Sequence, residues 1–239
     1  MKASIFCLPS IGSRAEIEAG MAATRPELYQ RMLKELTELV KLADDLGYDS
    51  VSFTEHHFHI EGFELSNNPV LLDLYFAMQT KRILVGQLGI VLPAANPIRV
   101  AEDIAMLDHM TGGRACAGFA RGYQRRWVDV MAQQTHGVSG TLPHHHYAID
   151  QANREAFEEN WQIIKKCWTE EMLTFNGQIL EGSGRRNALG SRDHGEIRQG
   201  GREWHADVGW CGAEAVAEAV PAGVPAVRVV AELYSMGRA

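Results

Sequence analysis

The chain has 239 residues, of which 46% are hydrophobic and 22% charged, and this composition excludes extensive disorder and fits one large globular domain or two small ones. A net charge of −7 without any lysine- or arginine-rich run argues against nucleic-acid binding. No stretch approaches the roughly 18 apolar residues of a membrane span, and the apolar run at the N-terminus is too short for a signal peptide. The four cysteines form no Cys-x-x-Cys pair, so we expect reduced thiols in a cytoplasmic protein.

Strand-like and helix-like patterns alternate along the first three quarters of the chain. We predict strands at residues 3–8, 49–55, 82–93 and 114–120, and helices at 24–47, 66–80, 97–110 and 147–174. A polar loop is expected between the first strand and the first helix. That helix has a candidate capping box, Thr24 with Glu27, and a glycine stop at Gly47. The nearly continuous apolar run 82–93 fits a strand that is buried on both faces.

This alternation predicts an α/β fold with a parallel sheet, either doubly wound or closed into a (β/α)₈ barrel. In both architectures the chemistry lies at the C-terminal ends of the strands. Two polar segments fall there, FTEHHFH at 53–59 and ARGYQRR at 120–126. The chain has no Gly-x-Gly-x-x-Gly, no Walker-type phosphate loop and no Gly-x-Ser-x-Gly motif, which disfavours three common kinds of site.

Residues 181–239 differ from the rest of the chain. They contain no lysine and seven arginines, and eight glycines fall between residues 182 and 212. Only a weak helix at 213–220 and a weak strand at 224–232 are predicted there. We therefore divide the chain into a barrel-like portion, 1–180, and an atypical tail, 181–239.

The histidines of the first polar segment admit several interpretations. His56 and His57 can be catalytic, because histidine exchanges protons near neutral pH, or can be ordinary polar residues at a strand end. His59 is expected to be an ordinary loop residue. The His57-x-His59 spacing also occurs in metal sites, but no further ligands follow the later strands, so no metal is expected. The run 144–146, three histidines, is expected to be a solvated loop.

Other charged and aromatic residues receive simpler predictions. Arg121 follows a buried strand and precedes a glycine, which suits a phosphate contact because the guanidinium is a planar fork. Arg125 and Arg126 are expected to be solvated. Arg99, Asp103 and Asp108 are expected on the helix surface or in a dimer seam. Trp161 and Trp168 fit a stripe of core residues on one helix face.

Four stretches resemble the bacterial luciferase-like flavin monooxygenases, and the resemblance covers about residues 1–175. They are YDSVSFTEHHF, VGQLGIVLPAANPIRVAEDIAMLDHMTGGR, GFARGYQRR and NREAFEENWQIIKKCWTEE. The resemblance implies a TIM (β/α)₈ barrel, here incomplete or abbreviated after the fourth or fifth βα unit. It also implies a monooxygenase that uses reduced FMN and O₂ to oxidise a small, aldehyde-like organic substrate. A deazaflavin, F420, is the alternative cofactor.

The same resemblance assigns roles to individual residues. The catalytic group is His56, near the flavin ring, with Glu55 and His57 beside it. The cofactor-binding group is Leu88 and Gly89, joined by a nonproline cis peptide beneath the ring, Arg121 and Arg154 at the phosphate, Gly122, and Tyr123 with its backbone at the ring edge. A separate flavin reductase and a homodimer formed through the helices at 66–80 and 97–110 are implied as partners.

Two positions depart from the family pattern. Ala120 stands where luciferase has a reactive cysteine, so that thiol is not required. After the weak strand at 224–232, Glu232 is followed by Leu233, which only loosely resembles the Glu-Ser pair that contacts phosphate in the family. A flavin-binding protein without turnover and a truncated inactive member therefore stay open as alternatives.

Overall fold

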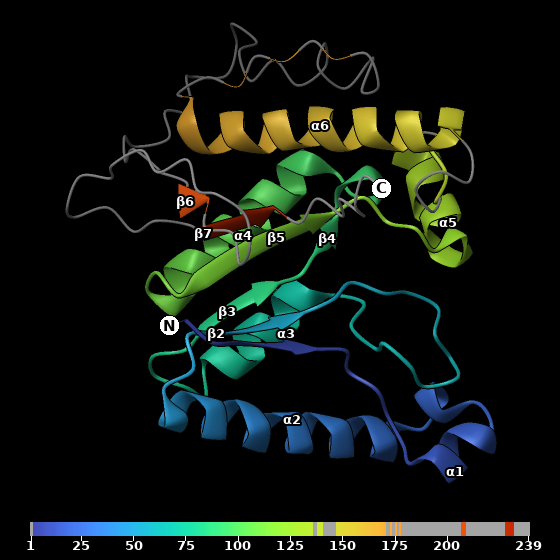
Figure 1. Cartoon of the computed structure of the whole chain (residues 1–239), viewed down its shortest axis with the longest axis vertical. Helices are drawn as coiled ribbons and strands as arrows, with labels where there is room; N and C mark the ends of the chain where they lie inside the picture. Colours follow the sequence, from blue (N-terminus) through green and yellow to red (C-terminus); the bar gives the residue numbers. More distant parts are fainter. Residues whose placement is uncertain are drawn as a thin grey trace, which may run out of the picture.

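The computed structural model describes residues 2–135, 138–140, 147–170, 173, 175, 177, 207–208 and 228–231. In this part the chain forms strands with helices packed around them (Figure 1). The strands are β1 (Ser4–Cys7), β2 (Ser50–Phe53), β3 (Leu84–Gln87), β4 (Ile90–Val91), β5 (Ala115–Ala120), β6 (Asp207–Val208) and β7 (Arg228–Ala231). The helices are α1 (Arg14–Glu18), α2 (Pro26–Leu46), α3 (Pro69–Ala77), α4 (Pro97–Thr111), α5 (Arg125–Thr135) and α6 (Tyr147–Thr169), with short 3₁₀ turns η1 (Ala22–Thr24) and η2 (Leu92–Ala94).

All of these strands belong to one parallel sheet, which confirms the predicted α/β architecture. Their order is β1-β2-β3-β5-β7-β6, and the short β4 pairs with β5. Strand β7 runs beside β5, with Ala117 opposite Val229, so it takes the place of a fifth barrel strand and lies within the predicted strand 224–232. Strands β1 and β6 stand at the two ends of this order. The predicted helix 213–220, together with Glu232 and Leu233, lies outside the described residues.

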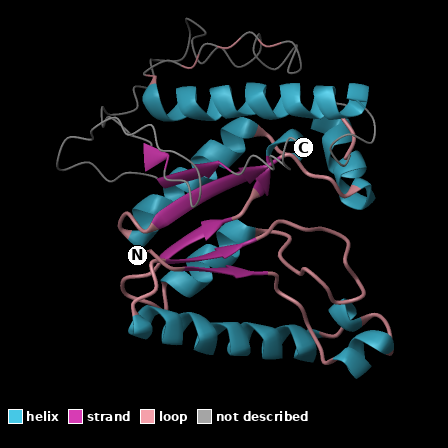
Figure 2. Cartoon of the chain, viewed as in Figure 1, coloured by secondary structure: helices cyan, strands magenta, loops and turns pink. Residues whose placement is uncertain are grey.

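Two apolar clusters join the helices to the two halves of the sheet. One lies between β1–β3 and the helices α2 and α3, and includes Val51, Phe53 and Phe76. The other lies between β4–β5 and the helices α4 and α6, and includes Phe119 and Trp168. Trp161 packs against this second cluster, which confirms the predicted tryptophan stripe. Figure 2 shows the strands between α2 on one side and α6 on the other.

The helix ends confirm some capping predictions and correct one. Gly47 ends α2 in the left-handed conformation, with φ of 82°, as its sequence position indicates. The predicted Thr24–Glu27 capping box is wrong, because α2 has no side-chain cap and the Thr24 hydroxyl donates to the Met21 carbonyl within η1. The real capping box is formed by Ser13 and Glu16 in α1, inside the segment predicted to be a loop.

Other boundaries also differ from the prediction. The apolar run 82–93 is not one strand, because a cis peptide bond at Leu88-Gly89 separates β3 from β4. A Cβ on Gly89 would lie 2.8 Å from the Phe119 backbone, so glycine is required where this turn meets β5. Helix α6 ends at Thr169 rather than at residue 174, and α5 was not predicted. None of the described helices is long and apolar enough to cross a bilayer.

Asp108 corrects a further prediction, since it is buried rather than at the surface of α4. One of its carboxylate oxygens accepts a hydrogen bond from the Ala115 amide at the start of β5. Asp103 is half-buried and Arg99 is exposed, so only part of this group lies on the helix surface. Arg125 and Arg126 are exposed as predicted, and they pair with Asp129 and Glu61.

Candidate functional site

The segments that follow β2 and β5 meet at the C-terminal edge of the sheet, where Figure 2 shows the long loop after β2 on the same side as α5. Because parallel strands present their carboxyl ends at one edge, side chains distant in sequence gather there. A direct contact joins the two segments: His59 Nε2 lies 2.8 Å from Gln124 Oε1. Gln124 also donates to Glu64 Oε2, over 3.1 Å.

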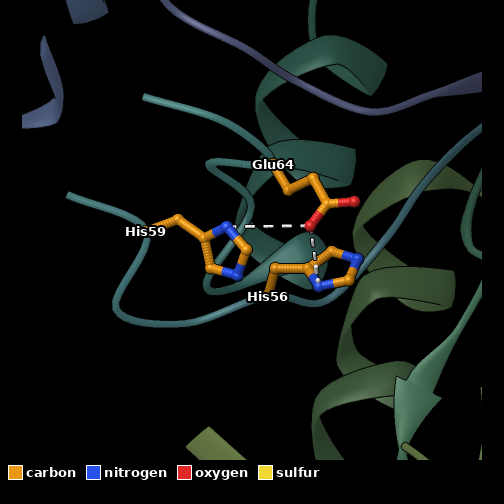
Figure 3. A group of neighbouring side chains, drawn as sticks. All are labelled: His56, His59 and Glu64. Atoms are coloured by element: carbon orange, nitrogen blue, oxygen red, sulfur yellow. Dashed lines mark ion pairs between the residues drawn. The ribbon is translucent and has the colours of Figure 1, made fainter. Parts of the chain in front are cut away.

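The loop at residues 54–68, which we call the histidine loop, folds two histidines onto one carboxylate (Figure 3). His56 Nδ1 lies 3.5 Å and His59 Nδ1 3.7 Å from Glu64 Oε2. Both histidines are 9% exposed, so the expectation of an ordinary loop position for His59 is wrong. The reason is the backbone path of the loop, in which Phe58 and Glu64 adopt positive φ angles of 62° and 49°.

Burial dominates the titration of His56. Removal from water lowers its pKa below the ordinary value, while the negative charge of Glu64 and a hydrogen bond to Gln124 partly oppose this effect. His56 Nδ1 is buried and has no hydrogen-bond partner among the described residues. The imidazole is therefore neutral near pH 7, with a ring nitrogen still available for a ligand or a proton.

His57 points to a different partner. Its Nε2 lies 3.1 Å from Glu55 Oε1, and its ring lies 4.8 Å from the Trp127 ring. The other oxygen of Glu55 accepts a hydrogen bond of 2.6 Å from the Val91 amide. Glu55 thus ties the histidine loop to β4, and His57 is fixed between Glu55 and an indole ring.

The nonproline cis peptide predicted at Leu88-Gly89 is present, between β3 and β4. Gly89 is buried and Leu88 is half-buried. This bond lies at the C-terminal end of β3, next to the end of β2 in the sheet. The cofactor-binding role of the two residues stays a prediction.

The two arginines predicted to bind phosphate meet at one carboxylate, Asp150 of α6. Arg121 Nη1 lies 2.8 Å from Asp150 Oδ1, and both side chains are largely buried. Arg154 Nη2 lies 3.9 Å from the other oxygen of Asp150, and its side chain is 46% exposed. Asn153 fixes the backbone beside them, because its amide donates to the Arg121 carbonyl over 2.9 Å.

The glycine after Arg121 is required by both its backbone and its surroundings. Gly122 has φ of 74°, and a Cβ there would lie 2.4 Å from Val91 Cγ1. Tyr123 is half-exposed, and its hydroxyl accepts a hydrogen bond from Gln124 Nε2 over 3.3 Å.

Three contributing residues carried no signal in the sequence: Glu64, Gln124 and Asp150. Each acts through a contact with a distant part of the chain. Arg121 and Asp150, for example, are 29 positions apart in the sequence. The sequence predicted no metal site, and in its one metal-like spacing, His57-x-His59, His57 contacts Glu55. His194 and His205, like residues 144–146, lie outside the described part of the chain.

A parallel sheet wrapped by helices, with ionisable side chains at the C-terminal strand ends, defines an α/β protein of the TIM-barrel type. Residues 1–194 match the family described as luciferase-like monooxygenase, so the chain belongs to this family. It is 34% identical over 151 residues to the alkanal monooxygenase alpha chain of Photorhabdus laumondii. The matched segment is 63% of this chain and 37% of that protein.

Solved structures show the same relationship. The monooxygenase RslO1 from Streptomyces bottropensis superposes with a TM-score of 0.53 at 26% identity, over 74% of this chain and 46% of that one. The oxygenating constituent of 3,6-diketocamphane monooxygenase from Pseudomonas putida, solved in complex with FMN, has a TM-score of 0.55 at 23% identity and supports the fold. It covers 75% of this chain and 42% of that one. The chain thus spans less than half the length of these relatives.

Proposed function

We propose that the chain is a flavin-dependent monooxygenase that uses reduced FMN and O₂ to oxidise a small organic molecule of the aldehyde class. Family membership supports the reaction type, and similarity to alkanal monooxygenases, whose name denotes aliphatic aldehydes, supports the substrate class. The single observation that carries the proposal is His56, whose buried Nδ1 makes no hydrogen bond to any described residue, at an edge shared with the Leu88-Gly89 peptide and Arg121.

The described residues fit such a cofactor in chemical type. Arg121 and Arg154 would hold the flavin phosphate, since two guanidinium groups around one anionic oxygen group already bind the Asp150 carboxylate. Gly89 and Gly122 are required by close packing against Phe119 and Val91, and their role toward the cofactor is what the family resemblance implies. Among the described residues His56 Nδ1 makes no hydrogen bond and has only the 3.5 Å contact with Glu64 Oε2, so it can interact with a polar group of the cofactor.

Reduced FMN, when bound, supplies the electrons with which O₂ is activated. The chain's own residues would hold a proton, orient side chains and exclude water. His56 would hold a proton at Nδ1 close to the reacting groups, and Glu55 would keep His57 in one orientation through their 3.1 Å contact. The apolar side chains around β4, among them Trp127 and Val128, exclude water from the inner wall of this edge.

Anaerobic titration of the purified chain with reduced FMN tests the proposal. We expect saturable binding at one flavin per chain, followed by aldehyde oxidation when O₂ is admitted. Absence of binding would refute the proposal. Parallel titration with reduced F420 decides the alternative cofactor.

A flavin-binding role without turnover is the second candidate. It is favoured by the strand order, in which β1 and β6 stand at opposite ends of the described sheet. An open site would leave the bound flavin exposed to water. Tight flavin binding with O₂ consumption but no oxidised aldehyde would establish this candidate.

The proposal includes partners and a compartment. A separate reductase would supply reduced FMN, as the family resemblance implies. A homodimer through α3 and α4 would cover five exposed apolar residues on or directly after these helices: Leu71, Tyr75, Met78, Met106 and Met110. Sedimentation of Leu71→Glu against the parent protein tests the dimer. The free thiols of Cys7, Cys116 and Cys167 fit a cytoplasmic protein.

A further inference from the structure

The histidine loop places three potential metal ligands around one point (Figure 3). One ligand atom each from His56, His59 and Glu64 lie within 4.8 Å of one another. Two of the separations are shorter, 3.5 Å and 3.7 Å from the histidine Nδ1 atoms to the same Glu64 oxygen. Atoms bound to one tetrahedral zinc ion at about 2.0–2.2 Å lie roughly 3.3 Å apart, so the ligand atoms would have to approach one another by up to about 1.5 Å when an ion binds.

The nitrogen lone pairs are available for such a ligand. His56 Nδ1 is buried and has no hydrogen-bond partner among the residues that the structure describes. His59 Nε2 lies 2.8 Å from Gln124 Oε1, an acceptor, so in the neutral tautomer that donates to Gln124 the lone pair is on Nδ1. A metal-bound histidine that donates its other ring N–H to an oxygen is the usual arrangement in metal sites.

The donor set decides which class of cation fits. Two imidazoles and one carboxylate suit zinc and its neighbours among the divalent transition metals, whereas Mg²⁺ and Ca²⁺ prefer oxygen ligands alone. The two histidine side chains are 10% and 9% exposed and Glu64 is 24% exposed, so an ion reaches the group from the carboxylate side. Three protein ligands leave a fourth position for water or an exogenous molecule.

We propose that His56, His59 and Glu64 bind one divalent cation of the zinc class. This set differs from the His57-x-His59 pair that the sequence suggests, because His57 contacts Glu55 instead. Metal binding does not depend on the flavin. If the proposed function also holds, zinc inhibits the oxidation, because the cation binds the ring nitrogen of His56 that the oxidation requires.

Calorimetric titration of the full-length, tag-free and metal-free chain with ZnCl₂ tests the site in the absence of flavin. Because the histidine run at 144–146 can itself chelate zinc, the reference protein carries the substitutions His144→Asn, His145→Asn and His146→Asn. We expect one zinc ion per reference chain and no heat with MgCl₂. His59→Asn and Glu64→Gln, added to the reference, are expected to weaken binding at least tenfold.

His109→Asn is the matched control, since it removes an exposed histidine on α4 and should change zinc affinity less than twofold. Cobalt supplies a readout that does not depend on variants: intense visible absorption bands indicate four-coordinate Co²⁺, and weak bands indicate a hydrated surface ion. Circular dichroism reports whether each variant folds. No zinc binding by the reference protein, equal binding by the variants, or only the weak cobalt spectrum would overturn the proposal.

The outcomes of the two proposals are separable. Titration with reduced FMN is carried out in the presence of a chelator, and titration with zinc in the absence of flavin. Flavin binding without zinc binding would refute the metal site and leave the proposed function intact. Zinc binding without flavin binding would support the metal site and refute the proposed function.

Discussion

The histidine loop and the segment around Arg121 lie at the same edge of the sheet, yet their polar groups are satisfied to different degrees. In the histidine loop, His56 Nδ1 has no hydrogen-bond partner among the described residues. At the other position, the Arg121 guanidinium already holds the Asp150 carboxylate at 2.8 Å. The first region can accept a ligand as it stands, whereas the second must exchange an internal anion for an external one.

This contrast has an energetic meaning. A buried arginine that loses the anion paired with it carries an uncompensated charge, so Asp150 stabilises the site when phosphate is absent. When phosphate is present, the same carboxylate competes with it. The following variants test whether the two regions differ in this way, beginning with the largest expected effect.

Arg121→Ala is expected to lower the affinity for FMN at least about 30-fold, because loss of one partner of a buried, hydrogen-bonded charge pair costs roughly 2 kcal/mol or more. Arg154→Ala is the matched control, since this side chain is half-exposed and lies 3.9 Å from Asp150. It should lower the affinity for FMN less than about fivefold, because surface ion pairs are worth about 1 kcal/mol at most. Fluorescence titration measures both. Equal losses would remove the distinction between the two arginines.

Glu55→Ala is expected to lower the free energy of unfolding by about 2 kcal/mol, because it leaves the Val91 amide and His57 Nε2 without their carboxylate. Glu61→Ala breaks only the surface pair with Arg126 and should cost less than about 0.5 kcal/mol. Urea denaturation gives both values. A small effect at Glu55 would show that the histidine loop is not anchored to β4 through this residue.

Asp150→Asn sharpens the comparison in the opposite direction. Removing the competing charge is expected to raise FMN affinity by about tenfold, a gain of roughly 1.5 kcal/mol, which is the low end of the coupling energies measured for close charge pairs. Riboflavin, which has no phosphate, serves as the control ligand and should bind unchanged. If Asp150 serves only to hold α6 in place, the variant will lose stability without any gain in FMN affinity.

Asp44→Asn probes stability at a site distant from both regions, with an expected loss of about 1 kcal/mol at pH 7. Burial would raise the pKa of Asp44, but hydrogen bonds from the amides of residues 81–83 lower it overall. A lowered pKa stabilises the fold above the pKa of the unfolded carboxyl, about 3.9, and the contribution disappears as the pH falls through the lowered value.

Urea titrations of Asp44→Asn and the parent chain at pH 7, 5 and 3 measure this effect. The difference between the two proteins should be constant at pH 7 and 5 and shrink toward pH 3. A difference that grows toward acid pH would contradict the sign of the pKa shift.

Much of the fold was predictable because its signals are local. Alternating apolar patterns located β1, β2, β5 and the long helices, and Gly47 marked the end of α2 because only glycine readily adopts its φ of 82°. The cis peptide at Leu88-Gly89 followed from the family resemblance, but one continuous strand was predicted through it because the run is apolar throughout. Local signals also misled at Thr24, where a capping pattern is present but the hydroxyl bonds within η1.

The site was predictable only in part. The family resemblance selected Glu55, His56, His57 and Arg121, and their segments lie at the ends of predicted strands. The burial of His59 was missed because its partner Gln124 lies 65 residues away, and that distance in sequence leaves no periodic pattern. Glu64 and Asp150 were missed for the same reason, since a carboxylate in a loop or at the start of a helix is usually solvated.

By itself, the sequence determined the class of fold, the order of strands and helices and the edge at which polar side chains gather, because periodicity and glycine positions act over a few residues. Tertiary structure alone decided which polar groups meet there. It paired Arg121 with Asp150, turned His57 toward Glu55, and brought His56 and His59 to one oxygen of Glu64. These pairings depend on how separate strand ends approach one another, which no local pattern encodes.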